Sequence, residues 1–184
     1  LVPPMAFIPA AERYGMMPLL DRWVIQPAFS QYATRHAPGA AGTCSINLSG
    51  KSICDDGLLA FVLGQFERHN VPPEGICFEI TETAAIANLN QAATLIRNLK
   101  AIGCRFSLDD FGSGMSSFAY LKHLRVDYLK IDGGFVKDMI DDPIDHAMVA
   151  SINHIGPVMG VQTIAEFVES DAIIAALREI GVVF

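Results

Sequence analysis

The sequence predicts an α/β fold built on a parallel sheet, and two observations support that prediction. Short apolar segments rich in β-branched and aromatic residues alternate along the chain with longer segments of helical periodicity. Each interval between two apolar segments leaves room for one helix, which is the pattern of repeated βαβ units. Five such strands are too many for a small sheet and too few for a closed eight-stranded barrel.

After a first helix the expected strands and helices alternate, except that no helix is expected between the third and the fourth strand. Strands are expected at residues 44–49, 76–82, 105–110, 126–132 and 161–166. Helices are expected at residues 10–36, 56–69, 89–102, 135–159 and 171–180. In the first helix, Leu19, Trp23 and Val24 gather on one face, so we expect Trp23 to lie in the core. No linker rich in Pro, Gly or Ser divides the chain, and we interpret residues 1–184 as a single domain.

Composition and charge exclude several classes of protein. Hydrophobic residues make up 51% of the chain, yet no run approaches the roughly 18 uncharged residues of a membrane span. The first residues, Leu1-Val2-Pro3-Pro4, lack the basic and apolar regions of a signal peptide, so we expect a soluble domain without membrane contact. The net charge of −7 is spread along the chain, which argues against binding of polymeric DNA or RNA. A small anion held through a bound cation is still compatible with it.

The cysteines point to a reducing compartment. Four are present, at Cys44, Cys54, Cys77 and Cys104, and no two of them form a CxxC motif. Three of the four lie within or beside apolar segments, as buried free thiols do. A zinc site or a disulfide framework is therefore not expected, and a cytoplasmic location fits best.

Polar side chains stand at the carboxyl end of every expected strand. In a parallel sheet or barrel these ends lie on one side, where ligands bind. The set consists of Asn47 and Ser49, Glu79 and Glu82, Asp109 and Asp110, Lys130 and Asp132, and Glu166 and Glu169. Lys130 and Asp132 are two residues apart and share a face of an extended strand. Asp109 and Asp110 are adjacent, so both reach one site only if the strand ends or bulges there, which Gly112 permits.

So many carboxylates repel one another unless cations lie among them. Oxygen ligands without His or Cys favour Mg²⁺ or Mn²⁺, and a pair of such ions is the arrangement used to hydrolyse phosphodiesters. The histidines lie away from the strand ends and are expected to be solvated or at helix ends: His36, His69, His123, His146 and His154.

Single members of the set also have structural interpretations. Glu82 or Glu169 alone could cap a helix or join an ion pair, and Asn47 alone could form a turn. Lys130 and Asp132 could be a buried structural pair. The coincidence at all five strand ends favours the metal site.

Five motifs carry a resemblance to a known family. They read SINLS, FEITET, SLDDFGSGMSSFAYL, DYLKID and IAEFVE, and their order and spacing resemble the EAL-domain family of bacterial phosphodiesterases. Members of that family convert the second messenger cyclic di-GMP to linear pGpG. The resemblance covers essentially the whole chain and implies a TIM-like (β/α) barrel of the EAL type. The signature Glu-Ala-Leu strand and the last βα unit are expected outside this chain.

The resemblance also implies roles for individual residues around two Mg²⁺ or Mn²⁺ ions. The matching metal-ligand positions are Asn47, Glu79, Asp109, Asp110, Asp132 and Glu166. Lys130 matches the residue that orients or helps to deprotonate the attacking water, and it is expected to act in catalysis with Asp109, Asp110 and Glu166. Glu82 and Glu169 are expected to stabilise a loop, and Glu82 is expected to reach Ser113, Ser116 and Ser117 in the segment that follows Asp110. The residues expected to contact the substrate are Ser113, Gly114 and Phe167.

Four residues depart from the family pattern. Phe167 replaces the Gly usually found between two glutamates, Gly133-Gly134 replaces a polar pair, and Met115 stands where an aromatic residue is common. The bulky Phe167 could displace Glu166 or narrow the pocket.

Two other functions are compatible with the pattern. The chain could be a catalytically inactive cyclic di-GMP receptor that relays a signal, although every matching ligand within the chain is present. It could also be another metal-dependent barrel enzyme acting on a carbonyl substrate, but that function would not predict the DDFG segment. The resemblance further implies a homodimer, fused to or regulated by sensory or diguanylate cyclase-like domains.

Overall fold

The computed structural model describes residues 2–35, 42–114 and 118–182. Its centre is a sheet of five parallel strands in the sequential order β1-β2-β3-β4-β5. The strands are β1 (Cys44–Asn47), β2 (Ile76–Thr81), β3 (Arg105–Phe111), β4 (Tyr128–Ile131) and β5 (Gln162–Ala165). Sequential order with right-handed crossovers adds each strand at the same edge, which is how a (β/α) barrel grows. The predicted α/β fold with a parallel sheet is confirmed.

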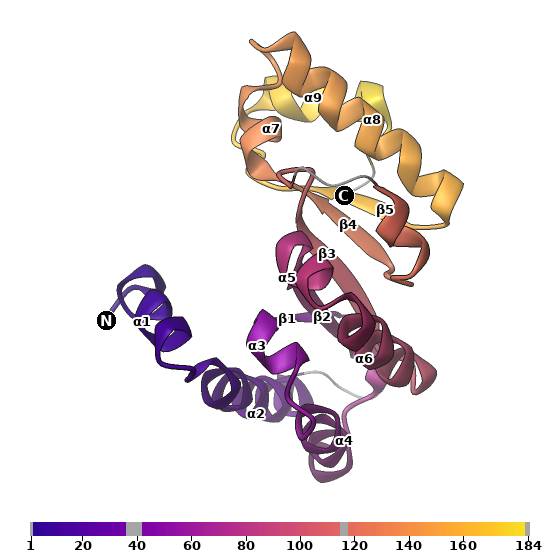
Figure 1. The fold of residues 1–184 in the computed structure, drawn as a ribbon. Coiled ribbons are helices and arrows are strands. Elements are labelled where there is room, and N and C mark those ends of the chain that lie inside the picture. Colours follow the sequence, from indigo (N-terminus) through magenta and orange to yellow (C-terminus); the bar gives the residue numbers. More distant parts are fainter. Residues whose placement is uncertain (1, 36–41, 115–117, 183–184) are drawn as a thin grey trace.

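The helices occupy the intervals between the strands (Figure 1). The α-helices are α1 (Ile8–Arg13), α2 (Met17–Arg35), α3 (Gly50–Ile53), α4 (Leu58–His69), α5 (Glu82–Ala87), α6 (Leu89–Ala101), α7 (Gly133–Asp138), α8 (Pro143–Met159) and α9 (Asp171–Ile180). Three short 3₁₀ helices complete the described elements: η1 (Pro4–Ala6), η2 (Pro73–Gly75) and η3 (Phe118–Lys122). None of the helices described here combines the length and apolar character that a membrane crossing requires.

The two faces of the sheet differ in polarity. Register pairs Ile46 with Phe78 and Phe78 with Phe106, and all three side chains are buried. One residue further along each strand, Asn47 pairs with Glu79 and stands on the opposite face. The apolar face therefore belongs to the core, and the other face leads to the polar strand ends.

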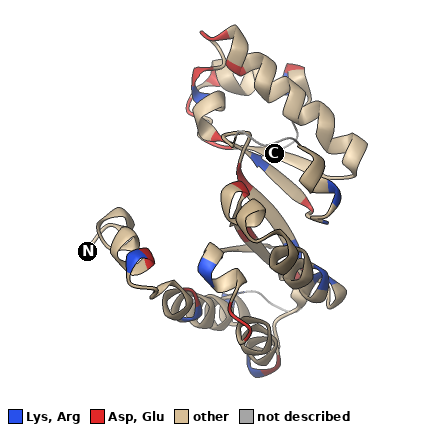
Figure 2. Cartoon of the chain, viewed as in Figure 1, with Lys and Arg blue, Asp and Glu red and all other residues tan. Residues whose placement is uncertain are grey.

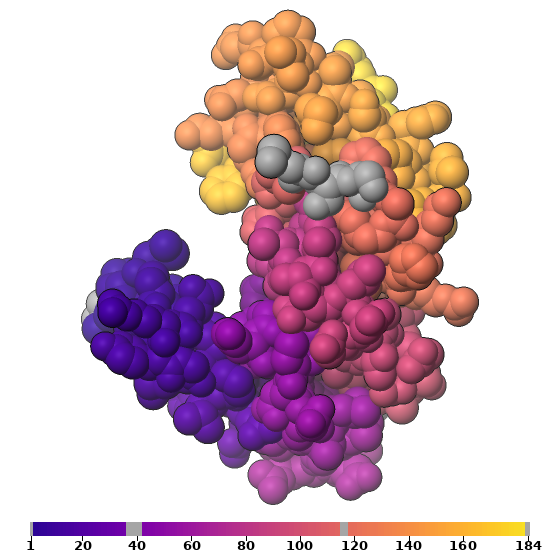
Figure 3. All heavy atoms as spheres, viewed as in Figure 1, coloured from indigo at the N-terminus to yellow at the C-terminus, as the bar shows by residue number. Residues whose placement is uncertain are grey.

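Two predicted helices are each divided in the structure. The helix expected at 10–36 ends at Arg13, and α2 begins at Met17 after Gly15, which has a positive φ of 68°. The helix expected at 135–159 forms α7 and α8, and the second begins where Asp142 caps the chain before Pro143. In the space-filling view, α1 and the start of α2 stand away from the half of the molecule that carries α7, α8 and α9 (Figure 3).

The prediction that Trp23 lies in the core is wrong. Its side chain is 70% exposed, whereas Asp21, Ile25 and Phe29 are buried. Trp23 lies about 200° around the helix from either Asp21 or Ile25, because each residue advances about 100°. The buried stripe of α2 runs through Asp21, Ile25 and Phe29 at intervals of four residues, so Trp23 lies on the opposite, solvent-facing side of the helix.

Candidate metal centre

Asp109 and Asp110 lie at a bulge near the end of β3. Leu108 pairs with Leu129 and Phe111 pairs with Ile131, so two residues of β3 stand opposite the single intervening residue of β4. Asp110 takes up the extra length with a positive φ of 53°, a conformation that Asp and Asn tolerate better than most residues. The bulge is the irregularity that two adjacent acids require if both are to reach one site.

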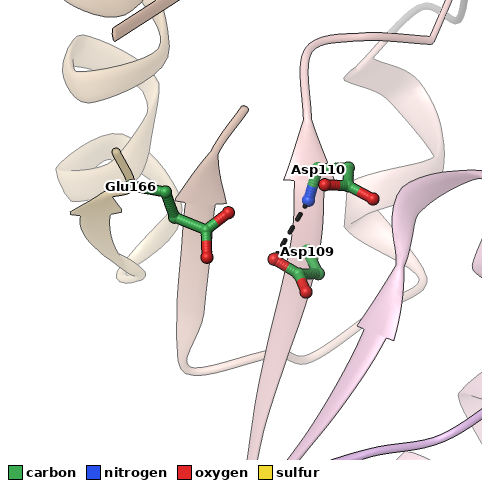
Figure 4. A group of neighbouring side chains, drawn as sticks. All are labelled: Asp109, Asp110 and Glu166. Atoms are coloured by element: carbon green, nitrogen blue, oxygen red, sulfur yellow. Dashed lines mark hydrogen bonds between the residues drawn. The ribbon is translucent and has the colours of Figure 1, made fainter. Parts of the chain in front are cut away.

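Glu166 brings a third carboxylate to the bulge. Asp109, Asp110 and Glu166 each offer a ligand oxygen, and these oxygens all lie within 4.8 Å of one another. Figure 4 shows the Glu166 carboxylate pointing from the end of β5 toward Asp109, whose own carboxylate accepts a hydrogen bond from the Asp110 N–H at 3.2 Å. Acidic segments are likewise visible at the ends of neighbouring strands in Figure 2.

Lys130 of β4 lies among the carboxylates. Its Nζ atom is 2.6 Å from Glu166 Oε1, 2.9 Å from Asp109 Oδ1 and 3.1 Å from Glu79 Oε2. The three carboxylates come from β2, β3 and the end of β5, so one ammonium group joins strand ends that are distant in sequence. Carboxylates from three strands therefore converge on a cation, and their oxygen atoms are the donors that Mg²⁺ or Mn²⁺ prefers. The residues present fit a divalent ion.

The pKa values follow from this crowding. Burial alone would lower the pKa of Lys130, but hydrogen bonds to Asp109 and Glu166 and the charge of Glu79 raise it above its usual range. The pKa of Asp110 is raised by burial and then by the charge of Asp109. The pKa of Glu166 is also raised by burial, although its hydrogen bond to Lys130 opposes that shift. The ammonium group of Lys130 is thus held in its charged form. The raised pKa values of Asp110 and Glu166 show that this single positive charge does not balance the carboxylates around it.

Two other predicted ligands stand at the edge of this group. Asp132 is the N-cap of α7, where its Oδ1 accepts the Gly134 N–H at 2.7 Å, and its charge raises the pKa of Asp110. Asn47 is exposed at the end of β1, and its side chain makes no hydrogen bond within the described residues. Lys130 pairs with Glu79 rather than with Asp132.

Glu82 holds the segment that follows the bulge. Its side chain is buried, with 1% of the residue exposed, at the start of α5. One carboxylate oxygen accepts the Gly112 N–H at 2.9 Å, and the other accepts the Tyr120 O–H at 2.6 Å. A Cβ atom on Gly114 would lie 3.3 Å from the same carboxylate. Burial raises the pKa of Tyr120, and so does its bond to Glu82, which keeps the phenol protonated as a donor.

The other residues predicted for the site are more peripheral. The Ser113 hydroxyl donates to the Asp110 carbonyl oxygen at 2.8 Å instead of reaching Glu82. Glu169 is exposed and makes no hydrogen bond or ion pair with any described residue. Phe167 is also exposed and directly follows Glu166. The predicted contacts of Ser116 and Ser117 and the variation at Met115 lie outside the described residues.

Sequence reasoning missed two contacts. Tyr120 was not selected, although it is the only tyrosine in the segment between the bulge and β4, and Glu82 lies 38 residues before it. Gly133 was noted as a departure from the pattern but not as the partner of Phe167, whose ring lies against it.

Comparison with known proteins gives a consistent result. The family model described as the EAL domain matches residues 1–184. Cyclic di-GMP phosphodiesterase PdeB of Shewanella oneidensis is 43% identical over 182 residues, which are 99% of this chain and 21% of that protein. These relatives are much longer than the chain, which spans 21% of the length of PdeB and 24% of the length of cyclic di-GMP phosphodiesterase PdeF of Escherichia coli.

Solved structures show the same fold. The phosphodiesterase PaMucR in complex with c-di-GMP matches with a TM-score of 0.92 at 32% identity, over 98% of this chain and 73% of that one. The FimX EAL domain from Pseudomonas aeruginosa bound to c-di-GMP matches with a TM-score of 0.90 at 31% identity, over 98% and 72%. The TIM-like fold of the EAL type is therefore confirmed.

Proposed function

The chain belongs to the EAL domain family, and on that premise we propose that it hydrolyses cyclic di-GMP to linear pGpG in bacterial second-messenger signalling. The observation that carries the proposal is the convergence of Asp109, Asp110 and Glu166, whose ligand oxygens lie within 4.8 Å of one another. A relative named as a cyclic di-GMP phosphodiesterase supports the activity, and a solved relative in complex with c-di-GMP supports the substrate.

We propose that two Mg²⁺ or Mn²⁺ ions bind at the strand ends. When bound, such ions supply Lewis-acid stabilisation of the negative charge that develops on the phosphoryl oxygens. They also reverse the local field, which otherwise repels an anionic substrate. The residues proposed to hold them are Asn47, Glu79, Asp109, Asp110, Asp132 and Glu166.

The protein's own groups position the reactants. Lys130 lies within hydrogen-bond distance of Asp109 and Glu166, and we propose that its ammonium group orients the attacking water and contributes fixed positive charge. Glu82 fixes the backbone at Gly112, and so limits the movement of the segment that begins at the two aspartates. Ser113, Gly114 and Phe167 are proposed to contact the substrate, and Glu169 to stabilise a loop.

The proposal includes the surroundings of the domain. Residues 1–184 are proposed to act as one domain, in a homodimer and with sensory or diguanylate cyclase-like partners in the same protein. The greater length of the curated relatives agrees with additional domains. A cytoplasmic location is proposed as well, and it agrees with the free thiols of Cys44, Cys54, Cys77 and Cys104.

Hydrolysis of cyclic di-GMP by the purified full-length protein tests the proposal. We expect pGpG to form with Mg²⁺ or Mn²⁺ and not with EDTA, and Asp110→Asn to reduce turnover by about a hundredfold. Asp138→Asn is the matched control, because it removes the same charge from an exposed position on α7. Equal turnover with EDTA and with Mg²⁺ would contradict the metal-dependent mechanism. Binding without hydrolysis under any ion would instead indicate the inactive receptor.

A further inference from the structure

Phe167 has a backbone conformation that its side chain disfavours. Its φ is 53°, in the left-handed region, where a non-glycine residue costs roughly 1 kcal/mol or more. The residue is also 62% exposed, so burial of the ring in the core does not offset that cost. A strained, exposed aromatic residue directly after Glu166 needs another explanation.

The ring of Phe167 lies against Gly133. A Cβ atom built on Gly133 would overlap the Cδ2 atom of Phe167 and would lie 2.7 Å from Cε2 and Cγ. Any side chain at Gly133 would therefore force the ring away from its present position. Gly133 itself has an ordinary backbone conformation, so the requirement for glycine comes from the ring and not from the turn.

This contact joins the two strand ends that carry predicted ligands. The last register pair of β4 and β5 is Ile131 with Ala165, and the next residues along the two strands are Asp132 and Glu166. Gly133 and Phe167 come one residue later, so the ring connects the segments that follow β4 and β5 directly beyond the acids. Asp132 in turn caps α7, whose first residue is Gly133.

We propose that Phe167, seated on Gly133, is a positioning residue that fixes the Glu166 carboxylate relative to Asp109 and Asp110. The contact restricts the backbone that leaves β5, and Glu166 is the residue immediately before it. A residue held on both sides loses less freedom when an ion binds, so the ring raises metal affinity without touching the ion. This inference rests on the proposed metal centre and extends it.

The test measures Mn²⁺ binding to the full-length protein by calorimetry without substrate. We expect Phe167→Gly to weaken binding by about tenfold, the usual effect of losing a group that orients a ligand. Gly133→Ala should weaken it similarly, because the new methyl group displaces the ring. In the Phe167→Gly background, Gly133→Ala should add no further loss, since the ring is already absent. Phe167→Tyr keeps the ring and should retain the affinity.

The controls separate positioning from general stability. Val168→Ala alters the next, partly exposed residue of the same segment and should leave Mn²⁺ affinity unchanged. Melting temperatures in EDTA show whether each variant folds, and Phe167→Ala replaces Phe167→Gly if the latter does not. Unchanged Mn²⁺ affinity in both Phe167→Gly and Gly133→Ala would overturn the proposal. Additive losses of Mn²⁺ affinity in the double variant would overturn it as well. Failure of the unaltered protein to bind Mn²⁺ would refute the metal centre itself, which is a separate result.

Discussion

Replacement of Glu82 by Ala should reduce turnover far more than it reduces substrate binding. The carboxylate accepts two hydrogen bonds inside the protein, from the Gly112 N–H at 2.9 Å and the Tyr120 O–H at 2.6 Å. Gly112 lies two residues beyond Asp110, so the contact restrains the backbone on which two proposed metal ligands stand. Glu82 is not among the residues proposed to contact the substrate, so substrate affinity should stay within about threefold of the original.

The loss of stability can be estimated from the same contacts. A hydrogen bond to a charged group contributes about 1.5–3 kcal/mol, so two such bonds contribute about 3–6 kcal/mol. Removal of the buried charge offsets part of this, because Glu82 no longer has to be desolvated. We therefore expect Glu82→Ala to lower the free energy of unfolding by about 2–4 kcal/mol. A mere helix cap would cost about 1 kcal/mol.

Two further variants separate the bonds. Tyr120→Phe removes one bond and should cost about 1.5–3 kcal/mol, with a smaller effect on turnover because Gly112 stays bound. Glu82→Gln can keep both contacts, since its amide oxygen accepts from Gly112 and its amide N–H donates to the tyrosine oxygen. We expect its turnover to lie between those of the unaltered protein and Glu82→Ala.

The assay measures turnover, nucleotide affinity and melting temperature on the same preparations. We expect turnover of Glu82→Ala to fall by about a hundredfold, the cost of misplacing a reacting group by about 1 Å. The Mg²⁺ concentration that this variant needs for half-maximal turnover should also rise. Glu67→Ala, at an exposed position on α4, controls for removal of a glutamate. Reduced stability with normal turnover would refute the reasoning, because it would make Glu82 a purely structural residue.

Three other perturbations test the centre itself. Asp110→Asn should reduce activity by about a hundredfold. Its melting temperature in EDTA should stay unchanged or rise, because the substitution relieves repulsion from Asp109 and Asp132, and a lower melting temperature would contradict this. Asp109→Asn should instead lower the melting temperature in EDTA, because it breaks the ion pair with Lys130, and an unchanged value would show that the pair contributes nothing. Ca²⁺ should bind and inhibit hydrolysis, since its irregular coordination does not hold the reacting groups as Mg²⁺ does, and turnover equal to that with Mg²⁺ would contradict the assignment.

The sheet and the placement of its acids could be predicted because both depend on local pattern. β-rich segments at regular intervals predict parallel strands, and the carboxyl ends of parallel strands meet wherever the helices lie. Adjacent acids before a glycine also indicated that the strand ends or bulges there, and the structure shows a bulge at Asp110. None of these inferences needed knowledge of a contact between distant residues.

Features that depend on long-range packing could not be predicted. The periodicity of residues 10–36 continues through the break at Gly15, and the exposed face of Trp23 is as apolar as the buried one. The pairing of Tyr120 with Glu82 spans 38 residues, and neither residue type indicates its partner. Phe167 and Gly133 each departed from the family pattern, but only coordinates show that one departure accommodates the other.

The charge balance of the centre favours two divalent ions over one. Five carboxylates gather there. Glu79, Asp109 and Glu166 form ion pairs with Lys130, and burial together with the charges of Asp109 and Asp132 raises the pKa of the fifth, Asp110. Lys130 offsets one of five negative charges, so a single divalent ion leaves a net negative site that repels a phosphodiester. A second ion brings the sum to zero, and only then does approach of the anionic substrate cost no electrostatic work. Substrate binding that saturates with one ion per chain would therefore contradict this account of why the acids are so numerous.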